Sequence, residues 1–116
     1  ANEAEITSLF RTSDFDAAIT AMRERVQVAA VTRSEKGSVV LAGDQTHLIA
    51  AAPVEKVVDT TGAGDQYAAG FLFGLAGGRP LPICGRLGSL AAAEVISHYG
   101  PRPQVNLKAL AADKGL

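Results

Sequence analysis

The sequence is short of the features that mark several large classes of protein. It has a single cysteine, Cys84, which cannot form an internal disulfide, so we expect a reducing, cytoplasmic setting and a buried apolar thiol. No apolar run approaches the roughly 20 residues that a membrane-spanning helix needs, and no signal-peptide pattern is found at the start. The formal net charge of −1 argues against nucleic acid or an anionic membrane as the main partner. A soluble chain is therefore expected.

Several catalytic and metal-binding motifs are also missing. No group of histidine, cysteine and aspartate has the spacing of a zinc site, and neither histidine has a nucleophile motif beside it. The glycines at positions 62 and 64 are not followed by Gly-Lys-Ser/Thr, so they do not form a Walker P-loop. They are also a poor dinucleotide fingerprint, because Tyr67 occupies the position of the third glycine.

The composition that remains, 47% hydrophobic and 20% charged among 116 residues, is typical of one globular unit. Apolar periodicity alternates between the strand and helix types along the chain, and a valine-rich run at 26–32 is typical of a buried parallel strand. This pattern predicts a three-layer α/β/α architecture, with helices on both faces of a mostly parallel sheet and one hairpin at Gly43-Asp44. Helices are expected after Asn2 and at 15–24, 64–76, 83–97 and 106–114, and strands at 26–32, 38–41, 46–50 and 53–58.

The most informative stretch is Asp-Thr-Thr-Gly-Ala-Gly-Asp at 59–65, directly before an apolar helical pattern. Glycine has no Cβ, so Gly62 and Gly64 let the backbone turn sharply and approach a ligand. The first amides of a helix lack intrahelical partners, and such a loop favours an anion, usually phosphate. A carboxylate at Asp65 would repel phosphate unless it has a chemical role, such as that of a general base for an attacking hydroxyl. The alternative is that Asp65 only caps the helix.

The same stretch, with the six residues after it, closely resembles the C-terminal signature of the ribokinase (pfkB) family of carbohydrate and nucleoside kinases. The resemblance implies that Asp65 is the catalytic base. It also implies that the amides of Gly62, Ala63 and Gly64 form an anion hole for the transferred phosphate. Asp59 would help to hold a monovalent cation. The residues of the motif resemble to some extent those of bacterial adenosine kinases.

Two other segments match this family, in the expected order along the chain. Asn2 and Glu5 have the spacing of a helix capping box, which is a sufficient explanation by itself. They also match the family's Asn-x-x-Glu motif, which implies that the pair helps to position Mg²⁺ through water. The stretch that contains Thr32, Ser34 and Gly37 resembles Val-Thr-x-Gly-x-x-Gly, which lines the nucleotide, although Ser34 replaces the usual glycine. The alternative for this segment is a plain turn between two strands.

A third match is the alanine-rich helix expected at 83–97, which resembles the family's helix beside the adenine and implies cofactor contacts at Ser89 and Ala92. Members of the family are considerably longer than this chain. Residues 1–116 are therefore expected to form the C-terminal nucleotide-binding and catalytic part of a ribokinase-like domain, with the N-terminal half absent.

The function that the resemblance implies is transfer of the ATP γ-phosphate to a hydroxyl of a sugar or a nucleoside, with Mg²⁺ and K⁺ as the candidate metal ions. A homodimer is one candidate assembly of the full-length protein. Two alternatives stay open at this point. The chain could be an inactive fragment that at most binds nucleotide, or an unrelated α/β module whose glycine-rich turn binds another anion.

Overall fold

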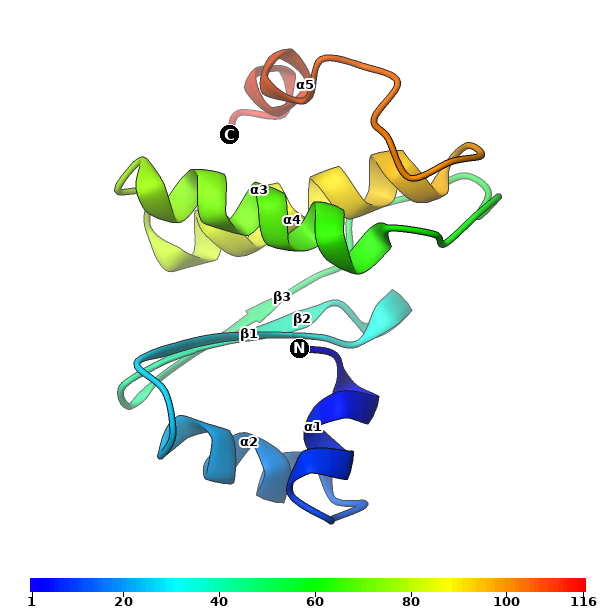
Figure 1. Cartoon of the computed structure of the whole chain (residues 1–116). Coiled ribbons are helices and arrows are strands. Elements are labelled where there is room, and N and C mark those ends of the chain that lie inside the picture. Colours follow the sequence, from blue (N-terminus) through cyan, green and yellow to red (C-terminus); the bar gives the residue numbers. More distant parts are fainter.

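The computed structural model describes all 116 residues and places a small sheet between two helical layers (Figure 1). Helices α1 and α2 cover one face of the sheet, α3 and α4 cover the other, and α5 lies on the outer side of α3 and α4. The three layers and all the expected helices are confirmed. The elements are α1 (Glu3–Leu9), α2 (Phe15–Arg23), β1 (Val28–Thr32), the 3₁₀ turn η1 (Ser34–Lys36), β2 (Ser38–Ala42), β3 (Gln45–Ile49), α3 (Ala63–Ala76), α4 (Leu81–Ile96) and α5 (Leu107–Asp113).

The sheet has the order β1-β2-β3, and both of its strand pairs are antiparallel. The prediction of a mostly parallel sheet is therefore wrong for these strands. The reason is the length of their connections, because parallel neighbours need a crossover of roughly a dozen residues or more. The hairpin predicted at Gly43-Asp44 is confirmed, since these two residues join β2 to β3.

The outer edge of β1 carries the single parallel pairing in the structure. Asn2 forms an isolated parallel bridge with Thr32. The N–H of Thr32 donates to the carbonyl of Ala1 across 2.9 Å, and the amino group of Ala1 donates to the carbonyl of Ala30 across 3.1 Å. The start of the chain therefore runs alongside the end of β1, whereas Val28 at the other end of the strand has no partner on that side.

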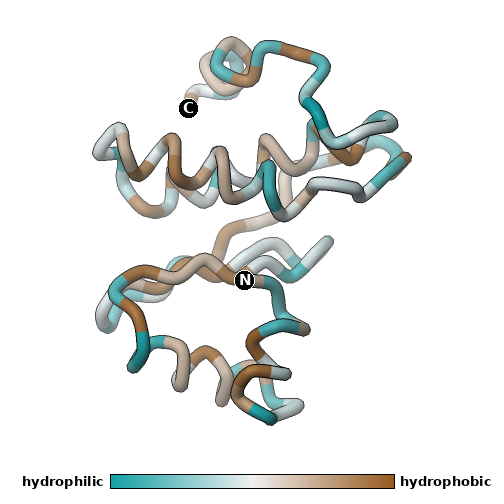
Figure 2. The backbone as a smooth tube through the Cα atoms, in the orientation of Figure 1, coloured by the Kyte–Doolittle hydropathy of each residue, from teal (hydrophilic) through white to brown (hydrophobic).

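Each face of the sheet contributes to a separate apolar core, because successive side chains of a strand point to opposite faces. Hydrophobic stretches follow the sheet between the two helical layers in Figure 2. Cys84 is fully buried in one of these cores, as expected for a small apolar thiol. The core members are Ile6, Ala18 and Val31 on the side of α1 and α2, and Val40, Ile49, Tyr67, Phe71 and Cys84 on the side of α3 and α4.

Glycines allow α3 and α4 to pack closely. A Cβ added at Gly70 would lie 2.5 Å from the carbonyl oxygen of Leu87, and a Cβ at Gly88 would lie 2.9 Å from the carbonyl oxygen of Tyr67. Gly85 has a similar role against the sheet, where a Cβ would lie 2.7 Å from Cγ1 of Ile49. Glycine weakens an isolated helix, and here close packing explains why α4 contains two of them.

The strand predicted at 53–58 is wrong, because no strand forms between β3 and α3. The N–H groups of Val58 and Asp59 donate instead to the carbonyl of Ile96, at 2.8 and 3.3 Å. This segment therefore leaves the sheet and follows the C-terminal end of α4. None of the helices combines the length and apolarity that crossing a bilayer requires.

Candidate functional site

Helix α3 begins at a glycine with no side-chain cap. Gly62 occupies the N-cap position with φ +80° and ψ 3°, in the left-handed region that favours glycine. The N–H of Ala63 donates to the carbonyl of Thr60 across 3.2 Å, whereas the N–H groups of Gly64 and Asp65 find no acceptor in the preceding loop. Two backbone donors are therefore free at the positive end of a 14-residue helix.

The approach to these donors is open. A Cβ built on Gly64 meets no atom within 4 Å. The side chain of Asp65 is exposed and forms no hydrogen bond or ion pair within the chain. Asp65 therefore does not cap α3 through a hydrogen bond, because this carboxylate accepts no amide of the helix. The other part of that alternative stays open, since a carboxylate in the first turn also interacts favourably with the helix dipole. What the geometry offers is a carboxylate free to accept a proton, beside backbone groups free to bind an anion.

Asp59 lies at the other end of the loop and is held by three donors. Its Oδ1 accepts the hydroxyl of Thr61 at 2.7 Å and the N–H of Thr61 at 3.0 Å, and its Oδ2 accepts the N–H of Gly100 at 3.0 Å. The hydrogen bond from the Thr61 hydroxyl has the largest effect on the pKa of Asp59. Together the three bonds lower this pKa to about 2. The carboxylate is therefore ionised at neutral pH, and its remaining lone pairs can accept a cation.

The segment after α4 packs against this loop. A Cβ on Gly62 would lie 2.7 Å from Cβ of Pro101, and Nε2 of Gln66 donates to the carbonyl of Pro101 across 3.2 Å. Sequence reasoning missed this segment. The sequence Gly100-Pro101 predicts a turn at this point. A turn motif does not predict which distant residues the turn will contact.

The segment resembling the nucleotide-lining motif is tied to α3. η1 is the turn that joins the paired strands β1 and β2, which fits the alternative of a strand–strand turn. Ser34 has φ +53°, a conformation that suits the glycine usual at this position. Gly37 has φ +89°, and a Cβ there would lie 2.0 Å from the carbonyl oxygen of Ile49. Directly after it, the buried hydroxyls of Ser38 and Tyr67 lie 2.8 Å apart. This bond joins the start of β2 to α3 just beyond Asp65.

The first helix lies beside the same turn. An open cleft of about 440 Å³ lies between residues 2–4 and residues 32–36. Arg33 crosses it to pair with Glu3 at 3.1 and 3.2 Å. Asn2 and Glu5 form the predicted capping box, in which each side chain accepts the other residue's N–H at 2.8 Å. The pair therefore has a structural role as a helix cap, and its role in positioning Mg²⁺ stays a prediction.

The two cofactor contacts implied on α4 have different surroundings. Ser89 is buried, and Ala92 packs against the core on the sheet side of the helix. No hydrogen bond joins either residue to the loop at 59–65, so both assignments stay predictions. No three histidine, cysteine or acidic side chains lie close enough together to hold a metal ion on their own.

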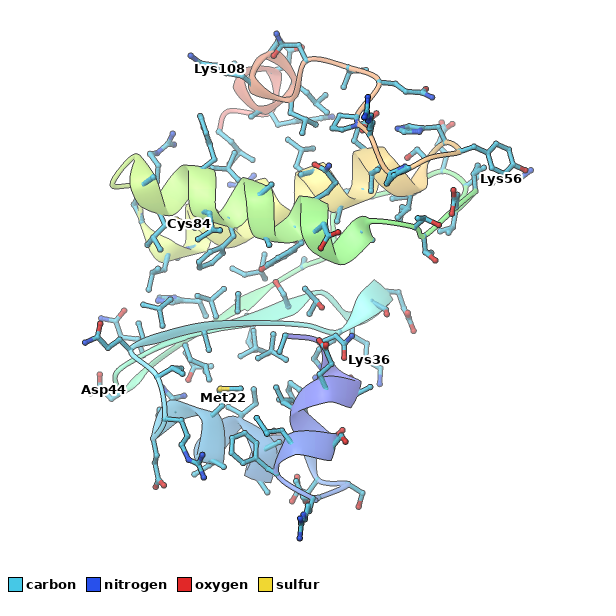
Figure 3. All side chains as sticks on the ribbon, in the orientation of Figure 1. Met22, Lys36, Asp44, Lys56, Cys84 and Lys108 are labelled. Carbon is cyan, nitrogen blue, oxygen red and sulfur yellow. The ribbon has the colours of Figure 1, made fainter.

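The candidate segments lie toward one side of the molecule. In Figure 3, Lys36 marks the end of η1 and Lys56 marks the loop that leads to Asp59, and both lie toward the same side as the start of α3. The bridge between Asn2 and Thr32 joins the nucleotide-lining segment to the start of the first helix, and the bond between Ser38 and Tyr67 joins the end of that segment to α3. This arrangement does not fit an unrelated module in which the three segments lie far apart.

Comparison with known proteins identifies similar chains over nearly this whole length. Residues 1–107 match the model of the pfkB family of carbohydrate kinases. An uncharacterised sugar kinase of Archaeoglobus fulgidus is 40% identical over 102 residues, which cover 87% of this chain and 40% of that protein.

Two solved structures are closely similar. A probable sugar kinase from Rhizobium etli CFN 42 has a TM-score of 0.97 and 46% identity, over 98% of this chain and 34% of that one. An adenosine kinase from Sinorhizobium meliloti has a TM-score of 0.93 and 50% identity, over 99% of this chain and 35% of that one. The chain therefore spans well under half the length of these relatives.

Proposed function

This chain belongs to the pfkB family of carbohydrate kinases, and we propose that it forms the phosphate-binding and catalytic part of an ATP-dependent kinase. Its three-layer fold is ribokinase-like. The reaction transfers the γ-phosphate of ATP to a hydroxyl of a sugar or a nucleoside. The observation that carries this proposal is the start of α3, where an unpaired carboxylate lies beside free backbone donors with an open approach.

In this mechanism the carboxylate of Asp65 accepts the proton of the acceptor hydroxyl as its oxygen attacks phosphorus. The anion hole predicted from the amides of Gly62, Ala63 and Gly64 is revised, because the N–H of Ala63 already donates to the carbonyl of Thr60. The N–H groups of Gly62, Gly64 and Asp65 stabilise the negative charge on the transferring phosphoryl oxygens. Such preorganised donors commonly supply the largest single contribution to catalysis, because they are already aimed at the developing charge. The absence of an internal partner for Asp65 supports its assignment as the base.

Two metal ions belong to the proposal. Asn2 and Glu5 would hold Mg²⁺ through water, which suits an ion that keeps several waters and binds few carboxylates directly. When bound, Mg²⁺ neutralises phosphate charge. Asp59 would contribute to a site for a monovalent cation such as K⁺, and its lowered pKa of about 2 fits that role because the group stays ionised.

The acceptor is proposed only as a sugar or a nucleoside, since one similar structure is a probable sugar kinase and another is an adenosine kinase. A second candidate function is considered because this chain covers only 34% and 35% of the length of these two kinases. The 116-residue chain alone could bind ATP without transferring phosphate. Titration of the isolated chain with ATP and Mg²⁺, together with a phosphate-transfer assay on sugars and nucleosides, separates the two. Clear transfer by the isolated chain would refute the binding-only function.

The test of the proposed base is Asp65→Asn in the full-length kinase. Turnover should fall by at least about 100-fold, the effect of losing a general base. The stability should change by no more than about 1 kcal/mol, the size of a charge–dipole interaction at a helix start, because the side chain is exposed and forms no hydrogen bond within the chain. Asp44→Asn, in the exposed β2–β3 hairpin, is the matched control and should leave turnover unchanged. If Asp65→Asn retained turnover within a few-fold of the wild type, Asp65 would not be the base.

A further inference from the structure

Glu94 in the last turn of α4 and His98, two residues after the end of this helix, form a pair of ionisable side chains that the proposed reaction does not use. Nε2 of His98 and Oε1 of Glu94 lie 2.8 Å apart. The other ring nitrogen of His98, Nδ1, lies 2.9 Å from the carbonyl oxygen of Tyr99. Both neighbours are acceptors, so both contacts are hydrogen bonds only when each nitrogen carries a proton. The geometry therefore favours the imidazolium form of His98.

The charges around His98 agree with this form. The hydrogen bond to the Tyr99 carbonyl, followed by that to Glu94, raises the pKa of His98 above its ordinary value. The other charged group that acts on it is the carboxylate of Asp59, which lies on the loop before α3. Two negative groups, one on α4 and one on the candidate site loop, therefore favour the same positive charge.

Glu94 connects both ends of the segment that follows α4. Its side chain is only 9% exposed, and Oε1 accepts the N–H of Gln104 at 3.0 Å in addition to Nε2 of His98. Its other oxygen, Oε2, is buried without a partner. A buried carboxylate with one unsatisfied oxygen is costly, so stability alone is a poor explanation for a glutamate at this position. What Glu94 does in the structure is to accept hydrogen bonds from both His98 and Gln104, which lie at the two ends of residues 98–104.

The segment fixed in this way touches the candidate site at two points. Gly100, at φ +88°, donates its N–H to Oδ2 of Asp59. Pro101 packs against Gly62 and accepts the side-chain amide of Gln66. Segment 98–104 therefore forms a brace against the loop at 59–62.

We propose that Glu94 and His98 are positioning residues that hold the loop at 59–62, through the brace at 98–104, in the geometry that phosphate transfer requires. The inference rests on the proposed function of that loop, but the brace itself can be observed without any activity. Asp65 is not part of the brace, so loss of the pair should leave the base in place while the anion-binding turn and Asp59 become mobile.

The test compares two substitutions of His98 in the full-length protein. His98→Phe keeps a ring of similar size and removes both donors, whereas His98→Arg keeps a cation with donors that can reach Glu94 and the Tyr99 carbonyl. In His98→Phe, amide hydrogen exchange at Asp59 and Gly100 should become at least about tenfold faster, while exchange within the β1–β2 pair stays unchanged. Turnover should fall about 10- to 100-fold, the scale of a small misplacement in an active site, with a smaller change in KM for ATP. His98→Arg should restore both readouts to within about threefold.

Arg102→Ala is the control within the brace, because Arg102 is exposed and forms no hydrogen bond, and it should leave both readouts unchanged. If His98→Phe fails to fold, Glu94→Gln provides the same readouts, since it keeps the size of the side chain and removes its charge. Unchanged exchange at Asp59 and Gly100 would overturn the brace whether or not the protein is a kinase. Faster exchange with unchanged turnover, in a protein whose Asp65→Asn variant is inactive, would overturn the positioning role.

Discussion

The N–H of Gly100 donates to Oδ2 of Asp59 across 3.0 Å and so joins two segments that lie 41 residues apart in the sequence. The bond connects the loop before α3 with the turn after α4. Because Thr61 holds the other carboxylate oxygen, Asp59 links its own loop to the neighbouring segment. The candidate site is therefore built from two loops rather than from the glycine motif alone.

The low pKa of Asp59 predicts a pH-dependent contribution to stability. The pKa falls from an ordinary value of 3.8 to about 2 in the folded chain. A lowered pKa in the folded state means that the contribution is complete above the unfolded pKa and is lost as the pH falls through the folded one. Asp59→Asn should therefore flatten the decline in stability between about pH 4 and pH 2. Urea unfolding across this range measures the effect, and Asp44→Asn is the control. Parallel curves for Asp59→Asn and the wild type would contradict the prediction.

A second prediction is that substitution of Gly64 lowers turnover but does not destabilise the fold. Gly64→Ala should keep or raise the free energy of unfolding, by up to about 1 kcal/mol, since alanine favours a helix and its Cβ meets no atom within 4 Å. The added methyl group should nevertheless lower turnover at least about tenfold, because it covers amides that are proposed to bind phosphate.

Gly70→Ala is the matched contrast on the same helix. Its Cβ would lie 2.5 Å from the carbonyl oxygen of Leu87, so α3 and α4 would have to separate. A loss of about 1–3 kcal/mol is expected from such overpacking. Chemical denaturation and steady-state kinetics on both variants check the pair of predictions. Full activity in Gly64→Ala would show that the ligand does not approach these amides closely.

A third prediction concerns the bond between Ser38 and Tyr67. Tyr67→Phe leaves the Ser38 hydroxyl, in a residue only 3% exposed, without a partner and should cost about 1–3 kcal/mol of stability. Adding Ser38→Ala removes the unsatisfied group, so the double variant should lose less than the two single losses combined. A double-mutant cycle by urea unfolding measures the coupling. Strictly additive losses would mean that the two hydroxyls do not bond in solution.

The helices were predictable because their starts depend on residues close in sequence. Asn2, Asp14 and Asn106 each accept a backbone N–H within the first turn of the helix that follows. The hairpin at Gly43-Asp44 is equally local. In contrast, residues 53–58 have the composition of a strand but form none. The N–H groups of Val58 and Asp59 bond instead to the carbonyl of Ile96, which lies far away in the sequence.

The candidate site divides in the same way. The positions of Gly62, Gly64 and Asp65 follow from a local motif at a helix start, so sequence reasoning located them. The brace formed by residues 98–104 depends on Glu94 and His98 meeting a loop from another part of the chain, and neither side chain belongs to a recognisable motif. Sequence alone could not separate these two residues from ordinary residues at the end of a helix.

The parallel bridge between Asn2 and Thr32 covers only one end of the first strand's outer side. Toward Val28 that side keeps its backbone groups unpaired, and the Val28 side chain is 38% exposed. Open strand borders of this kind accept another strand through main-chain bonds. When nothing else covers it, this border gives one copy of the chain a place to attach to another, so isolated copies should tend to self-associate as their concentration rises.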